Sequence, residues 1–353
     1  MKGTAWRDMI SNPVQLGGIE TSVLDNGPGR GTRIAWINTG TGLRYKVVVD
    51  RGMDIAEAFY NAANLTFISH LGVAAPQPFA RHGLEWLSTF GGGLLTTCGL
   101  HHFGPPEKDE NGERGLHGLI SNQPAEIESI RQPDPVSGQF DMHITGVIRE
   151  TKLFGPSLVL RRTIAGTLGK PEIRIHDEVS NVGNTRTAHM LLYHCNFGWP
   201  LVEEGARLLW KGSWKSGGSG SDHIFREGND FRTCPAPMKE HFAGGEAVAY
   251  IEPEADEAGG CSCGVYNARL GIAVALRFNR NQLPCLTNWQ HWGKNEYVTG
   301  LEPGTNPPVG QSQAREEGKL IYLNPGETRT YDLSFEILTD KAGIAEFVNQ
   351  HNL

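Results

Sequence analysis

The chain has few cysteines, no long hydrophobic run and no concentration of charge of one sign. Its 353 residues include six cysteines, and none of these forms a Cys-x-x-Cys pair, so the spacing does not favour a zinc site. No stretch approaches the ~18 apolar residues that a membrane-spanning helix needs. The formal net charge is -7, without a long basic run, which argues against nucleic acid and anionic membranes as main partners.

Common catalytic and targeting motifs are also missing. Residues 27–32 (GPGRGT) lack the Gly-Lys-Ser/Thr ending of a phosphate-binding loop, and neither Gly-x-Ser-x-Gly nor His-Glu-x-x-His occurs. Residues 1–18 contain neither the apolar segment nor the small-residue cleavage site of a secretion signal. We therefore expect a cytoplasmic protein with reduced thiols and no cofactor.

Glycine and proline, in contrast, are plentiful and predict many turns and strands. There are 45 glycines and 20 prolines. Apolar and polar residues alternate over 330–337 behind the Asn-Pro-Gly turn at 324–326, which is typical of a half-buried strand. Residues 170–184 repeat this pattern, and residues 45–60 indicate two strands interrupted by Arg51-Gly52.

Helical periodicity is rare, and the best case is the tail. Ile344, Phe347 and Val348 lie at i, i+3 and i+4, behind Thr339 and Asp340 as capping candidates. The polar segments 104–115 and 212–222 come without a change of strand pattern, so we interpret both as loops within one domain. The sequence predicts a single domain over residues 1–353, an all-β, large antiparallel β-sandwich with few short helices.

Three residues in strand-end contexts could carry chemistry. His194 follows an apolar approach and precedes Cys195, Asn196 and Phe197, so a partly buried imidazole could donate a proton there. Glu302 ends a short apolar run and is followed by Pro-Gly, which suits a general base. His117 has glycines on either side that allow close approach of a ligand. Taken singly, the local sequence favours a core histidine at 194 and an ordinary loop carboxylate at 302, and it does not decide the role of His117.

A metal site is the alternative for the histidines. His101 or His102 could join His117 as ligands, although adjacent strand residues face opposite sides, so only one of the first two could contribute. No carboxylate or cysteine completes the set at a typical spacing, and we expect no metal.

Together, four segments resemble the aldose 1-epimerase (galactose mutarotase-like) family. They are the Leu-His-Gly of residues 116–118, the histidine at 194 before a small-residue and aromatic run, the Leu-Glu-Pro of residues 301–303 and the closing Asn-Pro-Gly-Glu strand. Residues 91–106 and 115–118 also resemble the hexose-phosphate epimerase branch. The resemblance covers roughly residues 35–338 and implies a galactose mutarotase-like supersandwich, in an uncharacterised subgroup.

The resemblance implies an enzyme that interconverts the α and β anomers of a monosaccharide without a cofactor. Glu302 would take the proton of the C1 hydroxyl, His194 as imidazolium would donate to the ring oxygen, and His117 would bind a substrate oxygen. The family's Asn-His-Ser-Tyr-Phe-Asn run reads Tyr-His-Cys-Asn-Phe-Gly here, and the family's sugar-binding aspartate has only Asp222 as a candidate. Leu119, Ile120 and Ser121 stand where the phosphate-sugar branch has an arginine, which lowers the odds of a phosphorylated substrate.

Further residues are candidates for sugar contacts. Sugar rings have apolar faces and hydroxyl rims, so aromatic and polar side chains should line the pocket. The aromatic candidates are Trp86, Trp199, Trp289 and Trp292, and the polar ones are Arg51, Arg81, His82 and Gln290. Two other functions stay open: a non-catalytic carbohydrate-binding sandwich, and a sugar isomerase or lyase that uses the same acid/base pair. The identity of the sugar and the oligomeric state stay open as well.

Overall fold

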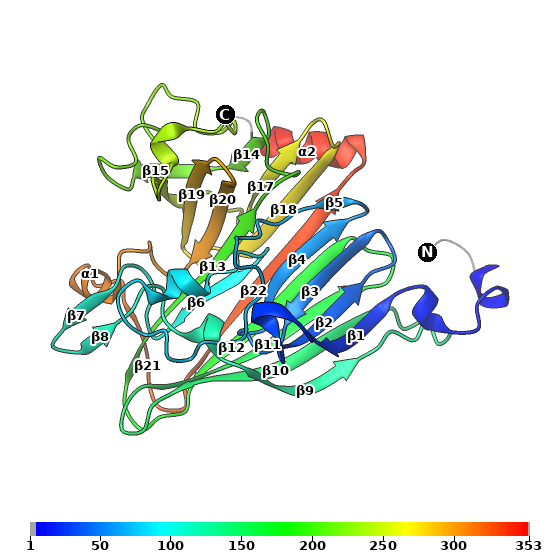
Figure 1. Cartoon of the computed structure of the whole chain (residues 1–353), viewed down its shortest axis with the longest axis horizontal. Helices are drawn as coiled ribbons and strands as arrows, with labels where there is room; N and C mark the ends of the chain where they lie inside the picture. Colours follow the sequence, from blue (N-terminus) through cyan, green and yellow to red (C-terminus); the bar gives the residue numbers. More distant parts are fainter. Residues whose placement is uncertain (1–4, 352–353) are drawn as a thin grey trace.

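The computed structural model describes residues 5–351, which fold into stacked antiparallel sheets with two short α-helices. Figure 1 shows long, twisted strands running side by side through the body of the molecule, with loops and a small hairpin at one end. Every pairing between named strands is antiparallel. The predicted all-β sandwich with few short helices is thereby confirmed.

The largest sheet has eight strands and supplies one wall of the core. Two strands from the C-terminal third and middle of the chain, β22 and β12, lie at its centre and pair with each other. In spatial order the sheet consists of β14 (Arg207–Trp210), β17 (Gly260–Asn267), β18 (Ile272–Asn279), β22 (Thr328–Leu338), β12 (Glu172–Asn181), β11 (Ser157–Thr167), β10 (Asp141–Thr151) and β9 (Ala125–Arg131).

A second sheet faces this wall and carries His194 and Glu302. β13 is its central element, because it pairs with β20, β21 and β6. The sheet consists of β15 (Gly212–Ser216), β16 (Ala247–Pro253), β19 (Cys285–Gly293), β20 (Glu296–Gly304), β13 (Thr187–Phe197) and β21 (Ile321–Leu323), with β6 (Thr96–Leu100) added on β13.

The remaining elements are smaller. A five-stranded sheet is formed by β1 (Gly18–Val23), β2 (Arg33–Asn38), β3 (Leu43–Val48), β4 (Asp54–Tyr60) and β5 (Ala63–Asn64). A hairpin, β7 (Glu107–Asp109) with β8 (Gly112–Arg114), projects at one end of the molecule (Figure 1). The α-helices are α1 (Gln311–Glu316) and α2 (Lys341–His351).

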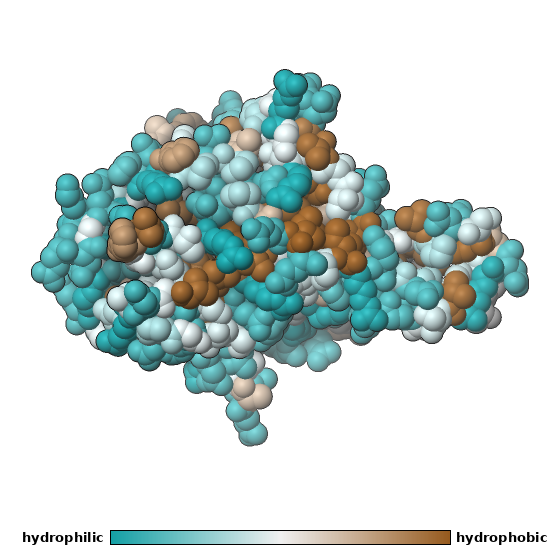
Figure 2. Space-filling view, turned by 90° about the horizontal axis from the view of Figure 1, so that it is seen from below, coloured by the Kyte–Doolittle hydropathy of each residue, from teal (hydrophilic) through white to brown (hydrophobic). Residues whose placement is uncertain are grey.

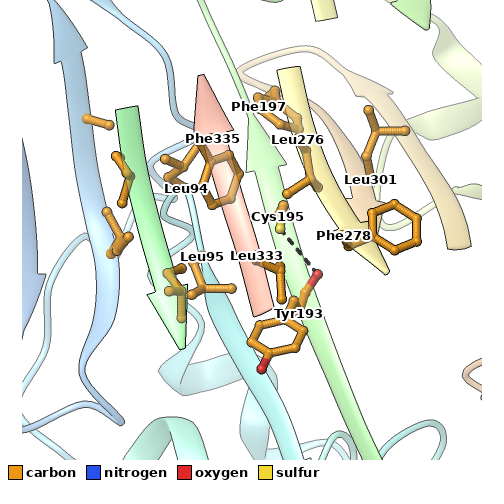
Figure 3. Close-up of a cluster of buried hydrophobic side chains, with 14 of the residues drawn as sticks. Leu94, Leu95, Tyr193, Cys195, Phe197, Leu276, Phe278, Leu301, Leu333 and Phe335 are labelled. Carbon is orange, nitrogen blue, oxygen red and sulfur yellow. Dashed lines mark hydrogen bonds between the residues drawn. The ribbon is translucent and has the colours of Figure 1, made fainter. Parts of the chain in front are cut away.

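The core between the two large sheets is built from alternate residues of facing strands. Figure 3 shows Tyr193, Cys195 and Phe197 of β13 in the same cluster as Phe335 of β22 and Leu276 of β18. All five side chains are buried. Since successive residues of a strand point to opposite faces, the even-numbered residues of β13 must point away from this core. This alternation decides where His194 lies.

Most of the sequence-based expectations for strands and helices are confirmed. The alternating segments correspond to β22 and β12, residues 45–60 form β3 and β4 with the break at Arg51-Gly52, and the tail forms α2. The carboxylate of Asp340 accepts a hydrogen bond from the backbone N–H of Gly343 at 2.8 Å, which is an N-cap. Two segments differ: residues 104–115 contain the β7–β8 hairpin, and 212–222 begins with the edge strand β15.

The surface is mainly hydrophilic. On the face seen in Figure 2, hydrophobic residues gather in a band across the middle and on the projecting part, between larger hydrophilic areas. Within residues 5–351, no helix has the length and the apolar character needed to cross a membrane.

Candidate active site

His194 points out of the core and into a cavity. Its neighbours Tyr193 and Cys195 fill the interior between the sheets, so the strand alternation directs the imidazole to the other face of β13. Thr96 of β6 is its cross-strand partner. The side chain is only 8% exposed, and what surrounds it therefore controls its charge.

Glu302 reaches the same place from the adjacent strand. β20 pairs antiparallel with β13, and Leu301 lies opposite Cys195. This register brings Glu302 opposite His194. Nδ1 of His194 and Oε1 of Glu302 are 3.2 Å apart, and the glutamate side chain is 3% exposed. The two groups that were 108 residues apart in the sequence (302 − 194) therefore meet.

The cavity in front of this pair has a volume of about 910 Å³. That size lies within the range of small-molecule sites, ~300–1,000 Å³. Aromatic rings surround His194: the ring centroids of Phe90 and Trp289 both lie 5.4 Å from the imidazole. Trp86 stacks on Phe90 at 4.7 Å. Aromatic walls of this kind suit the apolar face of a sugar ring.

His117 forms part of the opposite wall and is held in an uncommon backbone conformation. Its φ of 57° lies in the left-handed region, where non-glycine residues are strained. The backbone is fixed there because its N–H donates to the carbonyl of Gly104 at 3.0 Å and its carbonyl accepts from the N–H of Gly99 at 3.1 Å. The imidazole lies edge-on to Trp86, with the ring centroids 4.7 Å apart, and 5.8 Å from that of His194.

Polar atoms without partners are concentrated at this cavity. Buried polar groups are normally hydrogen-bonded, so each exception calls for an explanation. Eleven buried side-chain nitrogen and oxygen atoms among residues 5–351 make no hydrogen bond, and four of them belong to cavity-lining residues. These four are Nδ1 of His117, Nδ1 of His194, Oγ1 of Thr287 and Oε1 of Glu302. A ligand rich in hydroxyl groups would satisfy them.

Burial shifts the pKa values of the pair in opposite directions. The desolvation of His194 lowers the pKa of its imidazole to about 4, although hydrogen bonding of the imidazole with the Asn196 side chain acts against this. Desolvation raises the pKa of the Glu302 carboxyl well above its usual range, and the nearby Glu246 carboxylate raises it further. The uncharged pair, with its proton on Glu302, is therefore favoured over the imidazolium and carboxylate expected from the sequence.

The cavity lining is acidic and has no basic partner. Glu246 and Glu296 line it in addition to Glu302, together with His70 and His291, and the described lining contains no lysine or arginine. Glu246 accepts a hydrogen bond from Nε1 of Trp289 at 2.7 Å. Neither carboxylate was predicted from the sequence. Glu246 immediately precedes β16, and its contact with Trp289 of β19 arises only when these two strands pair.

Of the polar residues expected to bind the sugar, four lie away from the cavity. Arg51 is buried, and its guanidinium donates to the backbone carbonyls of Ser121, Ala74 and Thr89 at 2.5, 3.2 and 2.9 Å. We correct its expected role to that of a scaffold. Arg81 and His82 lie exposed at the surface, where Nδ1 of His82 is 3.0 Å from the carboxylate of Glu113 and Nε of Arg81 donates to the carbonyl of Pro78 at 2.8 Å.

Gln290 is the fourth of these residues. It is buried on the face of β19 opposite Trp289, where its amide donates to the Phe231 carbonyl at 2.9 Å. Trp292 is also buried and away from the cavity. Asp222 lies at the surface, bonded to Ser216 at 2.6 Å. Of the expected residues, the cavity therefore brings together His117, His194, Glu302, Trp86 and Trp289.

The residues are not arranged as a metal centre. Within the described part of the chain, no group of three or more His, Cys, Asp and Glu side chains could hold a metal ion. His102 instead donates from Nε2 to the carbonyl of Pro105 at 3.1 Å, and His101 contacts the carbonyl of Ala188 through Nδ1 at 3.1 Å.

Comparisons with known proteins agree with this architecture. The model of a family described as "Domain of unknown function (DUF4432)" matches residues 29–337. The crystal structure of a "putative aldose 1-epimerase" from Klebsiella pneumoniae is similar, with a TM-score of 0.84 and 26% identity over 94% of this chain and 86% of that one. No curated protein matches this chain.

Two more distant structures share the fold. A galactose mutarotase-like protein from Clostridium acetobutylicum has a TM-score of 0.61 and 14% identity, over 91% of this chain and 98% of that one. The galactose 1-epimerase of Lactobacillus acidophilus has a TM-score of 0.60 and 12% identity, over the same shares. At these identities the likeness establishes the mutarotase-like fold alone.

Proposed function

We propose that this chain, which belongs to the DUF4432 family, is an isomerase of the aldose 1-epimerase type. It would interconvert the α and β anomers of a monosaccharide by general acid/base catalysis, with His194 and Glu302 as catalytic residues. We also propose that residues 1–353 form one domain. The observation that carries the function is the contact of 3.2 Å between the imidazole and the carboxyl at the wall of a cavity large enough for a sugar.

Ring opening needs one proton donor and one proton acceptor, and the pair holds one proton. In the free site burial places it on Glu302. When the substrate's hydroxyl groups replace the missing hydrogen bonds, the proton passes over the short distance to His194. The carboxylate of Glu302 then takes the proton of the C1 hydroxyl, and the imidazolium of His194 donates its proton to the ring oxygen.

These two transfers break the bond between C1 and the ring oxygen and leave an open-chain aldehyde. After rotation about the bond between C1 and C2, the ring oxygen attacks the other face of the carbonyl carbon. His194 takes back the ring-oxygen proton, Glu302 returns its proton to the C1 oxygen, and the other anomer is released. After release of the product the proton passes from His194 back to Glu302, so that protons balance over the cycle and the enzyme ends in its starting state. The aromatic rings around His194 lower the local dielectric constant, which strengthens each of these interactions.

The other cavity residues support binding. His117 offers Nδ1, which has no partner among residues 5–351, to a substrate oxygen. Trp86 and Trp289 provide surfaces for the apolar face of the ring. Without lysine or arginine in the described lining, and with Glu246 and Glu296 present, the cavity favours a sugar without phosphate or carboxylate.

The experiment is exchange spectroscopy by NMR, or polarimetry, over a panel of aldoses and their 6-phosphates. We expect Glu302→Gln and His194→Asn each to lower the rate of anomer exchange by a factor of ~10²–10⁴ while sugar binding is kept. Glu257→Gln and His176→Asn, at exposed positions away from the cavity, serve as matched controls and should keep wild-type rates.

Other outcomes identify the alternatives. Binding of sugars without faster exchange for any aldose would contradict the enzymatic proposal and favour a carbohydrate-binding module. Formation of a ketose or an unsaturated product would instead indicate an isomerase or lyase that uses the same pair.

A further inference from the structure

A second hollow lies beside the proposed active site, and nothing in the proposed reaction uses it. Its volume is about 450 Å³, and its lining includes Trp199, Phe67, Tyr297, Asn295 and Glu204. We propose that this hollow is a second saccharide subsite, which binds a further sugar ring of an oligosaccharide whose reducing end occupies the cavity at His194. The link to the reducing end rests on the proposed function, whereas binding of a saccharide at Trp199 does not.

Trp199 is a large apolar side chain that is left in solvent although its backbone is fixed. It is 68% exposed, and its indole N–H makes no hydrogen bond within the described part of the chain. Its carbonyl accepts from the side-chain amide of Asn64 at 3.0 Å, and the two carbonyls that follow accept from Asn267 at 3.0 and 3.1 Å. The backbone of this segment is thus held in place, so that a ligand covering the indole does not have to order the backbone.

Gly198, the residue before Trp199, also helps to fix the backbone of this segment. A Cβ at Gly198 would come within 2.6 Å of the Cα of Phe67, so the two backbones are in close contact. The N–H of Val202 also donates to the carbonyl of Gly198 at 2.9 Å. An exposed indole on a fixed backbone is a surface on which the C–H face of a sugar ring can stack.

The polar rim indicates what kind of ligand would lie there. The carboxylate of Glu204 and the side-chain amide of Asn295 make no hydrogen bond or ion pair to any of residues 5–351, and both are exposed. Glu203, in contrast, is held by Arg269 at 2.6 and 2.7 Å. No lysine or arginine is among the described lining residues, so the rim suits hydroxyl groups and not phosphate or carboxylate.

The hollow and the cavity share a wall, which connects the two sites. Phe67 lines both. At the start of β20, Tyr297 faces the hollow, whereas Glu296 and Val298 face the cavity, as expected from the alternation of side chains in a strand. A saccharide of two or three rings that crosses the Phe67 edge would therefore contact both sites.

The test compares Trp199→Ala with the wild-type protein on sugars of different length. The probes are galactose and glucose, the disaccharides lactose and maltose, and maltotriose. Anomer exchange gives kcat and KM for each, and calorimetric titration gives binding independently of turnover. The control is Phe154→Ala, which removes a fully exposed aromatic side chain in the β10–β11 turn.

We expect Trp199→Ala to raise KM and Kd for at least one disaccharide or for maltotriose by about tenfold, which corresponds to about 1.4 kcal/mol. The values for galactose and glucose should stay within about twofold, and Phe154→Ala should change none of them. Loss of oligosaccharide binding in a protein that shows no anomer exchange would support the subsite and contradict the proposed reaction. Equal effects on short and long sugars, or no effect on any of them, would overturn the subsite while exchange by the wild-type protein stands.

Discussion

Replacing Glu302 by glutamine should make the protein more stable as well as inactive. Glutamine has nearly the same shape as the protonated carboxyl group and cannot ionise. Burial raises the pKa of the native Glu302 carboxyl, so at neutral pH the folded protein must keep a proton that the unfolded chain releases. The substitution removes this requirement.

The sign and size follow from proton linkage. A carboxyl whose pKa is raised on folding makes its full contribution to the free energy of unfolding below the pKa that it has in the unfolded chain. This contribution is lost as the pH rises toward the pKa of the folded protein. Each pH unit in that interval removes about 1.4 kcal/mol from the wild-type protein and nothing from Glu302→Gln. Between pH 5.5 and 7.5, the variant's advantage in the free energy of unfolding should grow by about 2.7 kcal/mol, provided that the native carboxyl stays protonated.

Urea unfolding followed by fluorescence at pH 5.5, 6.5 and 7.5 measures this difference. The quantity of interest is the change with pH of the difference between wild type and variant, because all other titrating groups are common to both. Glu257→Gln, at an exposed position, should show a difference that is constant with pH. A constant difference for Glu302→Gln as well would refute the reasoning, since the buried carboxyl would then titrate as in the unfolded chain.

Two further predictions concern pH and the buried ion pairs. Because burial lowers the pKa of His194 to about 4, kcat/KM for anomer exchange should fall as the pH is lowered toward 4, where the pair takes up a second proton; a profile with an acidic limb near 6.5 would contradict this. Arg162 is fully buried and contacts Asp177 at 2.7 Å and Asp54 at 3.1 Å, so Arg162→Met should lower the free energy of unfolding by ~3–5 kcal/mol in urea titrations. Arg161→Met, at the exposed neighbouring position, should lower the free energy of unfolding by at most ~1 kcal/mol. Equal losses for the two variants would contradict the idea that burial makes the Arg162 ion pairs more important for stability.

The sequence predicts those strands that have one wet face. In β22, buried Tyr331, Leu333, Phe335 and Ile337 alternate with less buried residues, so the period of two is visible in the sequence. β13 carries no such signal, since all eleven of its residues are buried, between the core on one side and β6 and the cavity on the other. A strand covered on both faces gives no indication of which face any one residue takes. The prediction that the His194 side chain faces a substrate therefore rested on the family resemblance and not on periodicity.

The same rule explains which site residues could have been found. Trp289 and Gln290 are adjacent on β19, so only one of them could face the cavity, and the period of two would also have added Thr287 to the list. For Arg51 no local pattern was available. Its partners are carbonyls of residues 74, 89 and 121, and such contacts exist only after distant loops have packed. Site residues whose direction follows from the alternation of side chains in a strand could be predicted from the sequence, whereas contacts made by the packing of distant loops could not.

The unsatisfied atoms and the pKa shifts at the cavity have one common cause. Burial keeps His194 and Glu302 uncharged, and Nδ1 and Oε1 find no hydrogen-bond partner among residues 5–351, so these buried polar atoms destabilise the protein relative to apolar ones. A ligand that supplies hydroxyl groups removes this cost, and it also favours the charged form of the pair that the reaction needs. Binding and activation are therefore coupled through the same atoms, and a sugar analogue that lacks the C1 hydroxyl should bind more weakly to the wild-type protein, with less of that loss in Glu302→Gln.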